Sequence, residues 1–512
     1  MVALRKVDGL NNRINSISRF FPLLFLVFIT LWLRLTNLGY SDYYGDEIKA
    51  MWRPAPGQSA IEYLYAQKKG PTEFLVTYLD RFINPSYSNG FLLRLPFTLA
   101  GILGIYFFYR LVEMHFGKKI ALYSTLLVST NGIFIGLMRY AQYQSFVILF
   151  SLLALYFFSL AVQKGRWRTR GIYIGVAFWT AALFSHYDGV FIAPFAFYLL
   201  WRWYTQNAEL SVRARLAHLA IPFALSALVL AIYFIPYLFS ISEITSDYWT
   251  RRIAGPENVG EEKRSSILVF KLYNPLLALY IYPVLGILSL PRIKKTFPVV
   301  IWFAILWVVL EVAIFDPGTH IYNYLMPACI LLAFGLEVLE GVFIKVLGAV
   351  WGQRMNILWL ALLFGSLAAV SHLIFIDHTP EYPFENRKIL FWTVGNPDGE
   401  YKLWPYGFPY YRRWEDIREY LTTTENNGYY YTNEQYNISI FYIPLGYSHQ
   451  NAGYYIYIRN PQTFARREAS DKAYYWRKHY KPVKVFKYNG RVVADIYIMP
   501  PGSYGDILDE GY

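Results

Sequence analysis

The sequence predicts a polytopic α-helical membrane protein with about eleven transmembrane helices and a small extracytoplasmic α/β domain at the C-terminus. Three observations predict this fold class. Apolar runs of about 17 to 25 residues, the length that crosses a bilayer as a helix, recur between residues 20 and 376 of the 512-residue chain. Basic residues gather in every second loop. Beyond residue 376 the apolar runs give way to balanced charge and tyrosine-rich segments.

The apolar runs are interpreted as transmembrane helices in chain order. The first is long and lacks a small-residue cleavage site, so we expect it to remain as a signal anchor. The eleven runs cover residues 20–38, 91–111, 120–137, 145–162, 171–186, 189–204, 216–240, 266–290, 297–315, 322–344 and 355–376.

The net charge of +13 is concentrated on one side of the predicted membrane. If the N-terminus is cytoplasmic, the inside segments hold 19 Lys and Arg residues but only three acidic ones. This is the positive-inside bias of multi-pass proteins in the cell membrane, and it accounts for the charge without a nucleic-acid partner. It places loop 39–90 and the tail 377–512 outside the cytoplasm. Because Cys329 is the only cysteine, no intrachain disulfide is expected.

Two domains are predicted, a transmembrane domain over 1–376 and an extracytoplasmic α/β domain over 377–512. The first outer loop, 39–90, contains an amphipathic segment, KKGPTEFLVTYLDRF, which we expect to lie on the bilayer together with membrane lipid. In the tail, RRWEDIREYLTT and DKAYYWRKHY are typical of helices, while GYYYTNEQ, ISIFYIP, YYIYIRN, VKVFKYN and VADIYIMP are typical of strands.

An adjacent pair of acids, Asp46 and Glu47, follows the first apolar run. Neighbouring side chains point in different directions on a helix or a strand, so a cooperating pair like that of a glycosidase is not expected. One carboxylate suffices if the leaving group needs no proton, and a phosphate, whose second pKa is about 6, is such a group. A carboxylate base could then take the proton of an acceptor hydroxyl as it attacks a sugar on a lipid phosphate, inverting the anomeric centre.

Cations at the outer ends of the predicted helices could bind that phosphate. Lys68 and Lys69 precede Gly70-Pro71, Arg94 opens the second span, and Arg139 starts the turn MRYAQYQ. The alternative is that these side chains reach to lipid headgroups without a catalytic role.

The histidines of two outer turns are candidate substrate-binding residues. His186 and Tyr187 lie in SHYDG, and His320 and Tyr324 lie in GTHIYNY; each could equally be a structural residue of the interface. Three histidines at metal-ligand spacing do not occur, and Asp46 with Glu47 alone makes a weak metal site. We therefore expect no metal site, no cofactor and no required divalent metal.

An ordered set of short motifs resembles a known family. After the DE pair come KGP, LRLPFTLAGILG, RYAQYQS, FSHYDGVFIAP and HIYNYLMPACILLAFGL. Together they resemble the C-type membrane glycosyltransferases, most closely the branch of protein O-mannosyltransferases and lipid A aminoarabinose transferases. The resemblance implies a polyprenyl-phosphate sugar donor, Asp46 as base, Glu47 as a supporting acid, and Lys69 and Arg94 near the donor phosphate. Relatives often carry an acid in the second outer turn, where this chain has Gln142 and Gln144.

The expected function is an inverting glycosyltransferase that moves a sugar from a polyprenyl-phosphate donor to a hydroxyl of a protein, lipid or glycan acceptor on the extracytoplasmic face. A multi-span transporter or lipid flippase is the first alternative; its sites should lie at mid-membrane, and the nearest approach to a buried carboxylate is Glu311, close to the outer end of the ninth predicted span. The second alternative makes the tail a sugar- or partner-binding module for which the helices are an anchor.

Overall fold

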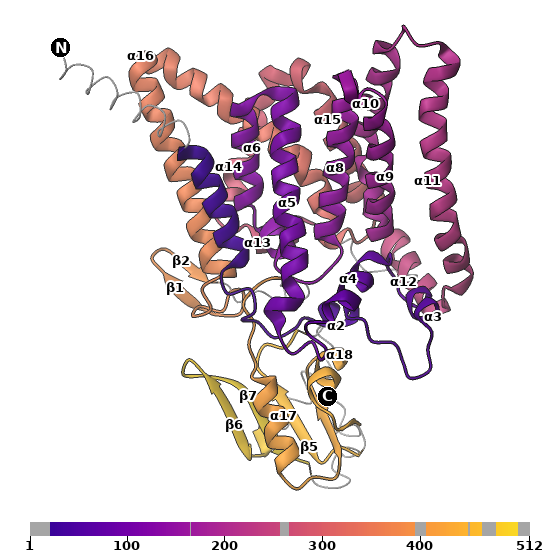
Figure 1. Ribbon diagram of the computed structural model, residues 1–512. Helices are drawn as coiled ribbons and strands as arrows, with labels where there is room; N and C mark the ends of the chain where they lie inside the picture. The colour runs from indigo at the N-terminus through magenta and orange to yellow at the C-terminus, as the bar shows by residue number, and fades with distance from the viewer. Residues whose placement is uncertain are drawn as a thin grey trace, which may run out of the picture.

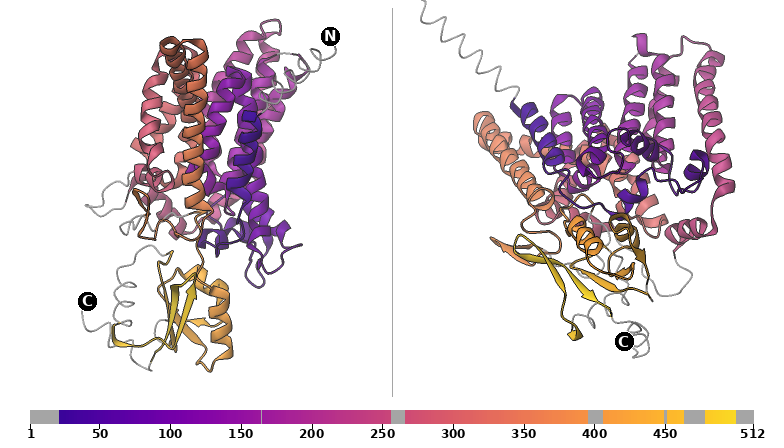
Figure 2. Two further views of the ribbon diagram at one scale, coloured as in Figure 1. Left: turned by 90° about the vertical axis from the view of Figure 1, so that its left-hand side faces the viewer. Right: turned by 60° about the horizontal axis from the view of Figure 1, so that its bottom comes forward.

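The computed structural model describes residues 21–163, 165–255, 266–394, 406–448, 451–462 and 478–499. It is mostly helical, at 69%, with a small C-terminal sheet region, and this confirms the predicted fold class. The long helices stand side by side, and the sheet lies beyond one end of them (Figure 1). Two further views show the sheet at the same end of the helices (Figure 2).

Each of the eleven apolar runs overlaps a helix. The helices are Phe21–Leu35, α5 (Gly90–Phe116), α6 (Lys118–Thr130), α7 (Gly132–Met138), α8 (Gln144–Val162), α9 (Arg170–Ser185), α10 (Ala193–Gln206), α11 (Val212–Ser240), α13 (Ser266–Tyr273), α14 (Leu277–Ser289), α15 (Ile293–Val308) and α16 (Tyr322–Phe375). Among the described residues, five helices are long and apolar enough to cross a membrane, or six if α6 and α7 cross together. The count of eleven spans therefore stays a prediction.

Two local features divide the apolar runs. Between α6 and α7 the chain bends by 64°, and the Asn131 side chain caps the new helix by accepting a hydrogen bond from the Ile133 amide (3.0 Å). Within α16, Gly348 has φ of 76°, a left-handed conformation that glycine adopts without a Cβ clash. This break separates the tenth and eleventh predicted runs.

The first outer loop folds into short helices at the same end of the bundle as the sheet (Figure 1). These are α2 (Gly45–Ala50), α3 (Ala60–Tyr65) and α4 (Thr72–Asp80), and α12 (Glu243–Ala254) joins them from a later loop. Helix α4 turns an apolar face outward, because Leu75 and Leu79 are exposed while the acids Glu73 and Asp80 are buried. This is the pattern expected of a helix lying at a membrane surface.

The C-terminal sheet has the strand order β4-β3-β5-β7-β6. β3 pairs parallel with β4 and β5, whereas β7 pairs antiparallel with β5 and β6. A separate hairpin is formed by β1 (Arg387–Ile389) and β2 (Trp392–Val394). The five strands are β3 (Tyr429–Thr432), β4 (Gly446–Tyr447), β5 (Tyr454–Ile458), β6 (Lys484–Tyr488) and β7 (Arg491–Ile498), accompanied by helices α17 (Trp414–Thr423) and α18 (Tyr436–Tyr442).

One predicted strand is wrong. The segment ISIFYIP lies largely in helix α18, where Ile438, Ser439 and Tyr442 are the buried residues. Tyr442 lies four residues after Ile438 and three after Ser439, and residues three or four apart share a face of a helix. A strand would instead bury alternate residues. The predicted helix DKAYYWRKHY lies mostly outside the described residues, which resume at residue 478.

Candidate active site

The two acids of α2 point into different environments. Glu47 is fully buried, and its carboxylate accepts hydrogen bonds from Arg94 Nε (2.8 Å) and Nη2 (2.7 Å). It also accepts the backbone N–H groups of Tyr44 (3.0 Å) and Ala141 (2.9 Å). These contacts tie the outer loop to α5 and to the turn after α7. Glu47 is therefore a structural joint between these elements, and its expected role as a supporting acid stays a prediction.

Arg94 and Arg139 also have partners other than a phosphate. All five N–H groups of the Arg94 guanidinium are used, two by Glu47 and three by the carbonyl oxygens of Leu38, Ser41 and Asp42. Arg139 is buried and donates to the carbonyl groups at the end of the first helix, Leu33, Arg34 and Thr36, where a cation is favoured by the helix dipole. Both guanidinium groups thus contact the protein itself, and the phosphate-binding role expected of the two arginines stays a prediction.

Asp46, by contrast, is accessible. Its side chain is 32% exposed and lies 3.3 Å from the Lys49 ammonium, and its Oδ2 accepts a hydrogen bond from the Tyr406 hydroxyl (3.0 Å). Burial acts to raise the pKa of Asp46, but Lys69, Lys49 and the Tyr406 hydrogen bond outweigh it and hold the pKa below its usual value. Asp46 is therefore an ionised carboxylate at neutral pH, as a proton acceptor must be.

Lys69 lies between Asp46 and a second acid that the sequence analysis did not single out. Its Nζ is 3.5 Å from Oε1 of Glu73 and 5.1 Å from the centre of the Tyr143 ring. The other Glu73 oxygen accepts the Tyr143 backbone N–H (2.9 Å). Burial raises the pKa of Glu73, and Lys69 only partly opposes this. Lys69 and Glu73 are four residues apart in the segment predicted to be amphipathic. This spacing was the sequence feature that could have indicated an ion pair between them.

The two histidine turns meet at Asp188, which the sequence analysis also missed. Oδ2 of Asp188 lies 2.6 Å from His320 Nδ1 and accepts the Tyr322 hydroxyl (2.7 Å), and Oδ1 lies 3.0 Å from His186 Nδ1. The His186 ring stacks on Tyr143 with centroids 3.8 Å apart. His186, Tyr187 and His320 thus lie together beside Lys69 and Tyr143, as their candidate role requires.

Tyr324 lies elsewhere. Its hydroxyl donates to Glu311 at 2.9 Å, and its ring packs against Phe303. Although Tyr324 is close to His320 in sequence, the helical geometry of α16 turns it toward α15. The structure does not bring Tyr324 beside the two histidines, and its expected role in substrate binding stays a prediction.

His186, Asp188 and His320 could also hold a metal ion. Each offers one ligand atom, and these atoms lie within 4.8 Å of one another; two imidazoles and a carboxylate suit zinc and related transition metals. Asp188 Oδ2 already accepts hydrogen bonds from His320 and Tyr322, whereas Asp188 Oδ1 makes no hydrogen bond within the described part of the chain and lies 3.0 Å from His186 Nδ1. The expectation that no metal is required stays a prediction.

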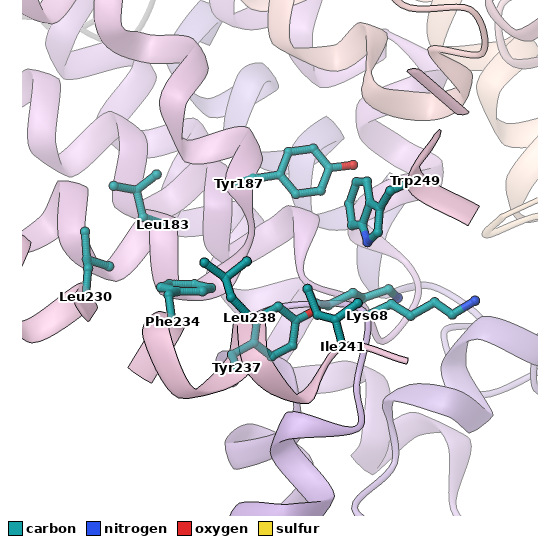
Figure 3. Close-up of a pocket in the computed structure, with 11 residues that line it drawn as sticks. Lys68, Leu183, Tyr187, Leu230, Phe234, Tyr237, Leu238, Ile241 and Trp249 are labelled. Carbon is teal, nitrogen blue, oxygen red and sulfur yellow. The ribbon is translucent and has the colours of Figure 1, made fainter. Parts of the chain in front are cut away.

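An open cavity of about 460 Å³ begins at Lys68 and Lys69. Its walls are mainly apolar and come from α9 and α11, and Tyr187 and Trp249 flank it. In Figure 3 the Lys68 ammonium lies at one end of this cavity, and Leu230 and Phe234 lie at the other. The cavity therefore combines a cationic mouth with an apolar wall, part of which lies on α11, a helix long and apolar enough to cross a membrane.

Gly70 permits the lysines to sit at this mouth. A Cβ at residue 70 would lie 1.9 Å from the carbonyl oxygen of Phe184, at the end of α9. Only glycine allows the backbones to approach so closely. On the other side, Lys68 Nζ lies 4.5 Å from the centre of the Tyr248 ring of α12, a cation–π contact that helps to orient the ammonium.

Comparison with known proteins supports the fold. The family model described as dolichyl-phosphate-mannose-protein mannosyltransferase matches residues 82–234, which run from the end of the first outer loop into α11. No curated protein sequence matches the chain. The archaeal oligosaccharyltransferase AglB from Archaeoglobus fulgidus, solved in complex with an inhibitory peptide and a dolichol-phosphate, is 11% identical with a TM-score of 0.51. That match covers 87% of this chain and 70% of AglB.

ArnT from Cupriavidus metallidurans matches over more of the chain with a lower score. The apo structure is 13% identical with a TM-score of 0.48, covering 95% of this chain and 98% of ArnT. The structure bound to undecaprenyl phosphate is 14% identical with a TM-score of 0.45, covering 94% and 98%. The predicted resemblance to the C-type membrane glycosyltransferases is confirmed.

Proposed function

We propose that this protein is an inverting glycosyltransferase that uses a polyprenyl-phosphate-linked sugar as donor and a hydroxyl group as acceptor. One observation carries the proposal: the only partly exposed acid of α2, Asp46, lies in the electrostatic field of Lys69, and Lys69 lines the mouth of an apolar cavity. A lipid phosphate, a sugar and an acceptor hydroxyl can then meet between a cation and a base.

The donor would bind with its phosphate at Lys68 and Lys69 and its isoprenoid chain along α9 and α11. Two ammonium groups stabilise a phosphate both in the bound donor and as a leaving group. The apolar wall formed by Leu183, Leu230 and Phe234 suits a hydrocarbon chain. AglB, which shares the fold, was solved with a dolichol-phosphate, a ligand of this chemical class.

The reaction would be a single displacement. The acceptor oxygen attacks the anomeric carbon, Asp46 takes the hydroxyl proton, and the bond between the anomeric carbon and the phosphate oxygen breaks, with its electron pair leaving on the phosphate. His186, Tyr187 and His320 lie together beside Tyr143 and would contact the sugar. Aromatic faces and imidazole donors are suited to a pyranose ring.

The reaction would take place outside the cytoplasm. Helix α2, which carries Asp46, lies with α4 and the C-terminal sheet at one end of the bundle (Figure 1), and the charge distribution predicts this end to be extracytoplasmic. The transporter alternative needs polar sites at mid-membrane. Its candidate Glu311 lies near the end of α15, in a contact with Tyr324, which does not favour transport.

Substitution of the lysines tests this donor site. Lys68→Gln and Lys69→Gln are each expected to raise the KM for a radiolabelled polyprenyl-phosphate sugar about tenfold or more, because a charge-assisted phosphate contact is worth about 1.5–3 kcal/mol. The assay uses the purified full-length protein in nanodiscs with candidate acceptors, with and without EDTA, and we expect chelation to leave transfer intact. Lys388→Gln, on the exposed β1 strand, is the control. An unchanged donor KM in both lysine variants would contradict the site.

Because Lys69 acts on both Asp46 and the donor phosphate, we expect donor binding to change the pH dependence of the reaction. In the free enzyme Lys69 lowers the pKa of Asp46, but a bound phosphate neutralises part of that charge. The acid limb of kcat should therefore lie about one pH unit above the acid limb of kcat/KM. In Lys69→Gln the acid limb of kcat/KM should move to higher pH, because the cation that lowers the pKa of Asp46 is gone. Profiles that extend below the usual aspartate pKa of about 3.9 test this, and a kcat limb at or below the kcat/KM limb would show that the bound phosphate does not act on Asp46.

A further inference from the structure

Tyr406 is brought to the candidate base by the chain that follows the last predicted span. Its hydroxyl donates to Oδ2 of Asp46 across 360 residues of sequence (3.0 Å). Its ring stacks on Tyr140 with centroids 4.9 Å apart and planes inclined by 13°. Its backbone N–H donates to the Tyr273 hydroxyl (2.9 Å). Helix α2, the turn between α7 and α8, and helix α13 therefore fix the position of one phenol.

The backbone around Tyr406 is held against the membrane helices with little free space. Gly407 has φ of 77°, and a Cβ there would lie 2.5 Å from the carbonyl oxygen of Gly136 in α7. A Cβ on Gly136 would in turn lie 2.6 Å from the carbonyl oxygen of Tyr406. Both positions thus favour glycine, for the close approach and, at Gly407, for the left-handed conformation.

The 406–410 segment also runs along the loop that leads into α2. The Phe408 carbonyl accepts hydrogen bonds from the Tyr44 hydroxyl and from Ser41 Oγ (3.1 Å), and the Tyr410 carbonyl accepts the Asp42 backbone N–H (2.8 Å). The segment 406–410 is therefore attached to the residues that lead into α2 as well as to Asp46 itself. Just beyond this segment, the Arg412 backbone N–H donates to the buried Asp42 carboxylate (2.5 Å). This bond joins the loop before α2 to the C-terminal domain.

From this geometry, and resting on the proposed function of Asp46, we infer that Tyr406 is a positioning residue for the catalytic base. Its hydroxyl binds Oδ2, while Oδ1 is held only by the exposed Lys49 ammonium at 3.3 Å and is the oxygen that would accept the acceptor proton. A hydrogen bond to the ionised form stabilises that form, so Tyr406 keeps Asp46 ionised and fixes its rotamer. The C-terminal domain is then a part of the reaction centre, because docking of this domain holds the 406–410 segment in place.

Tyr406→Phe tests this inference with little risk to folding, since phenylalanine keeps the ring stacked on Tyr140. We expect kcat to fall roughly tenfold through loss of base orientation, with the donor KM unchanged because the lysine cavity is untouched. The acid limb of kcat/KM should move upward by about one pH unit, since loss of the hydrogen bond raises the pKa of Asp46. A residue that merely supports folding would change the unfolding temperature rather than this limb.

The control is Tyr411→Phe, which removes a hydroxyl from the same stretch of chain that makes no hydrogen bond among the described residues. It should leave kcat, KM and the pH profile unchanged. If Asp46→Asn abolishes transfer but Tyr406→Phe alters neither kcat nor the acid limb, this inference is overturned while the proposed function stands. If Asp46→Asn retains transfer, the base assignment fails and the role of Tyr406 fails with it.

Discussion

Asp46→Asn is expected to lower kcat by about a thousandfold while the protein folds normally. General base catalysis by a placed side chain contributes roughly 10²–10⁴-fold, and asparagine keeps the shape of aspartate without its basicity. The amide oxygen can still accept the Tyr406 hydroxyl. Because the Asp46 side chain is 32% exposed, its replacement leaves no buried charge unpaired. Transfer of radiolabelled sugar by the purified variant, with its thermal unfolding measured beside it, checks both halves of the expectation.

Two results would contradict the assignment of Asp46. Transfer at a rate near that of the unsubstituted protein would show that another group takes the proton, and Glu73 is the next acid in the same field. Substrate flux through proteoliposomes without any glycosyl transfer would favour the transporter alternative. A donor KM raised in Asp46→Asn would show only that the carboxylate also contributes to donor binding, so the decisive quantity is kcat.

The sequence predicted the membrane architecture because helix formation in a bilayer depends on local composition. Each apolar run overlaps a helix, and the divergent directions of Asp46 and Glu47 follow from helix periodicity alone. The strand expected at ISIFYIP failed for a related reason, because alternation over seven residues does not distinguish a strand from a two-turn helix whose burial is decided by its neighbours.

The roles of individual charges were harder to predict, since they depend on partners far away in the sequence. Nothing near Arg94 indicates that its guanidinium is saturated by Glu47 and three carbonyl groups. Asp188 stood in the same motif as His186, but its role as the hub of the histidine cluster becomes visible only when His320 is brought beside it. Tyr406 is the extreme case, because its partner Asp46 lies 360 residues earlier.

Glu47→Gln is expected to produce the largest loss of stability among these variants. Removing one partner of a buried ion pair leaves the other charge uncompensated, which typically costs about 3–5 kcal/mol. Here Glu47 and Arg94 are both almost fully buried, and their ion pair joins the outer loop to α5. A large drop in the unfolding temperature in detergent, or aggregation on size exclusion, should follow. Replacing both residues, as Glu47→Gln with Arg94→Met, should recover part of the loss because no unpaired guanidinium remains.

The neighbouring variant Asp46→Asn is the matched control, since it removes one negative charge one residue earlier on the same short helix. If Asp46 is the base and Glu47 the joint, the first substitution loses kcat at nearly constant unfolding temperature, and the second loses stability first. The reverse result, a stable Glu47→Gln protein with no transfer, would return Glu47 to the chemistry and show that its ion pair with Arg94 opens during the reaction. The two adjacent acids therefore separate the catalytic from the structural interpretation within a single turn of helix.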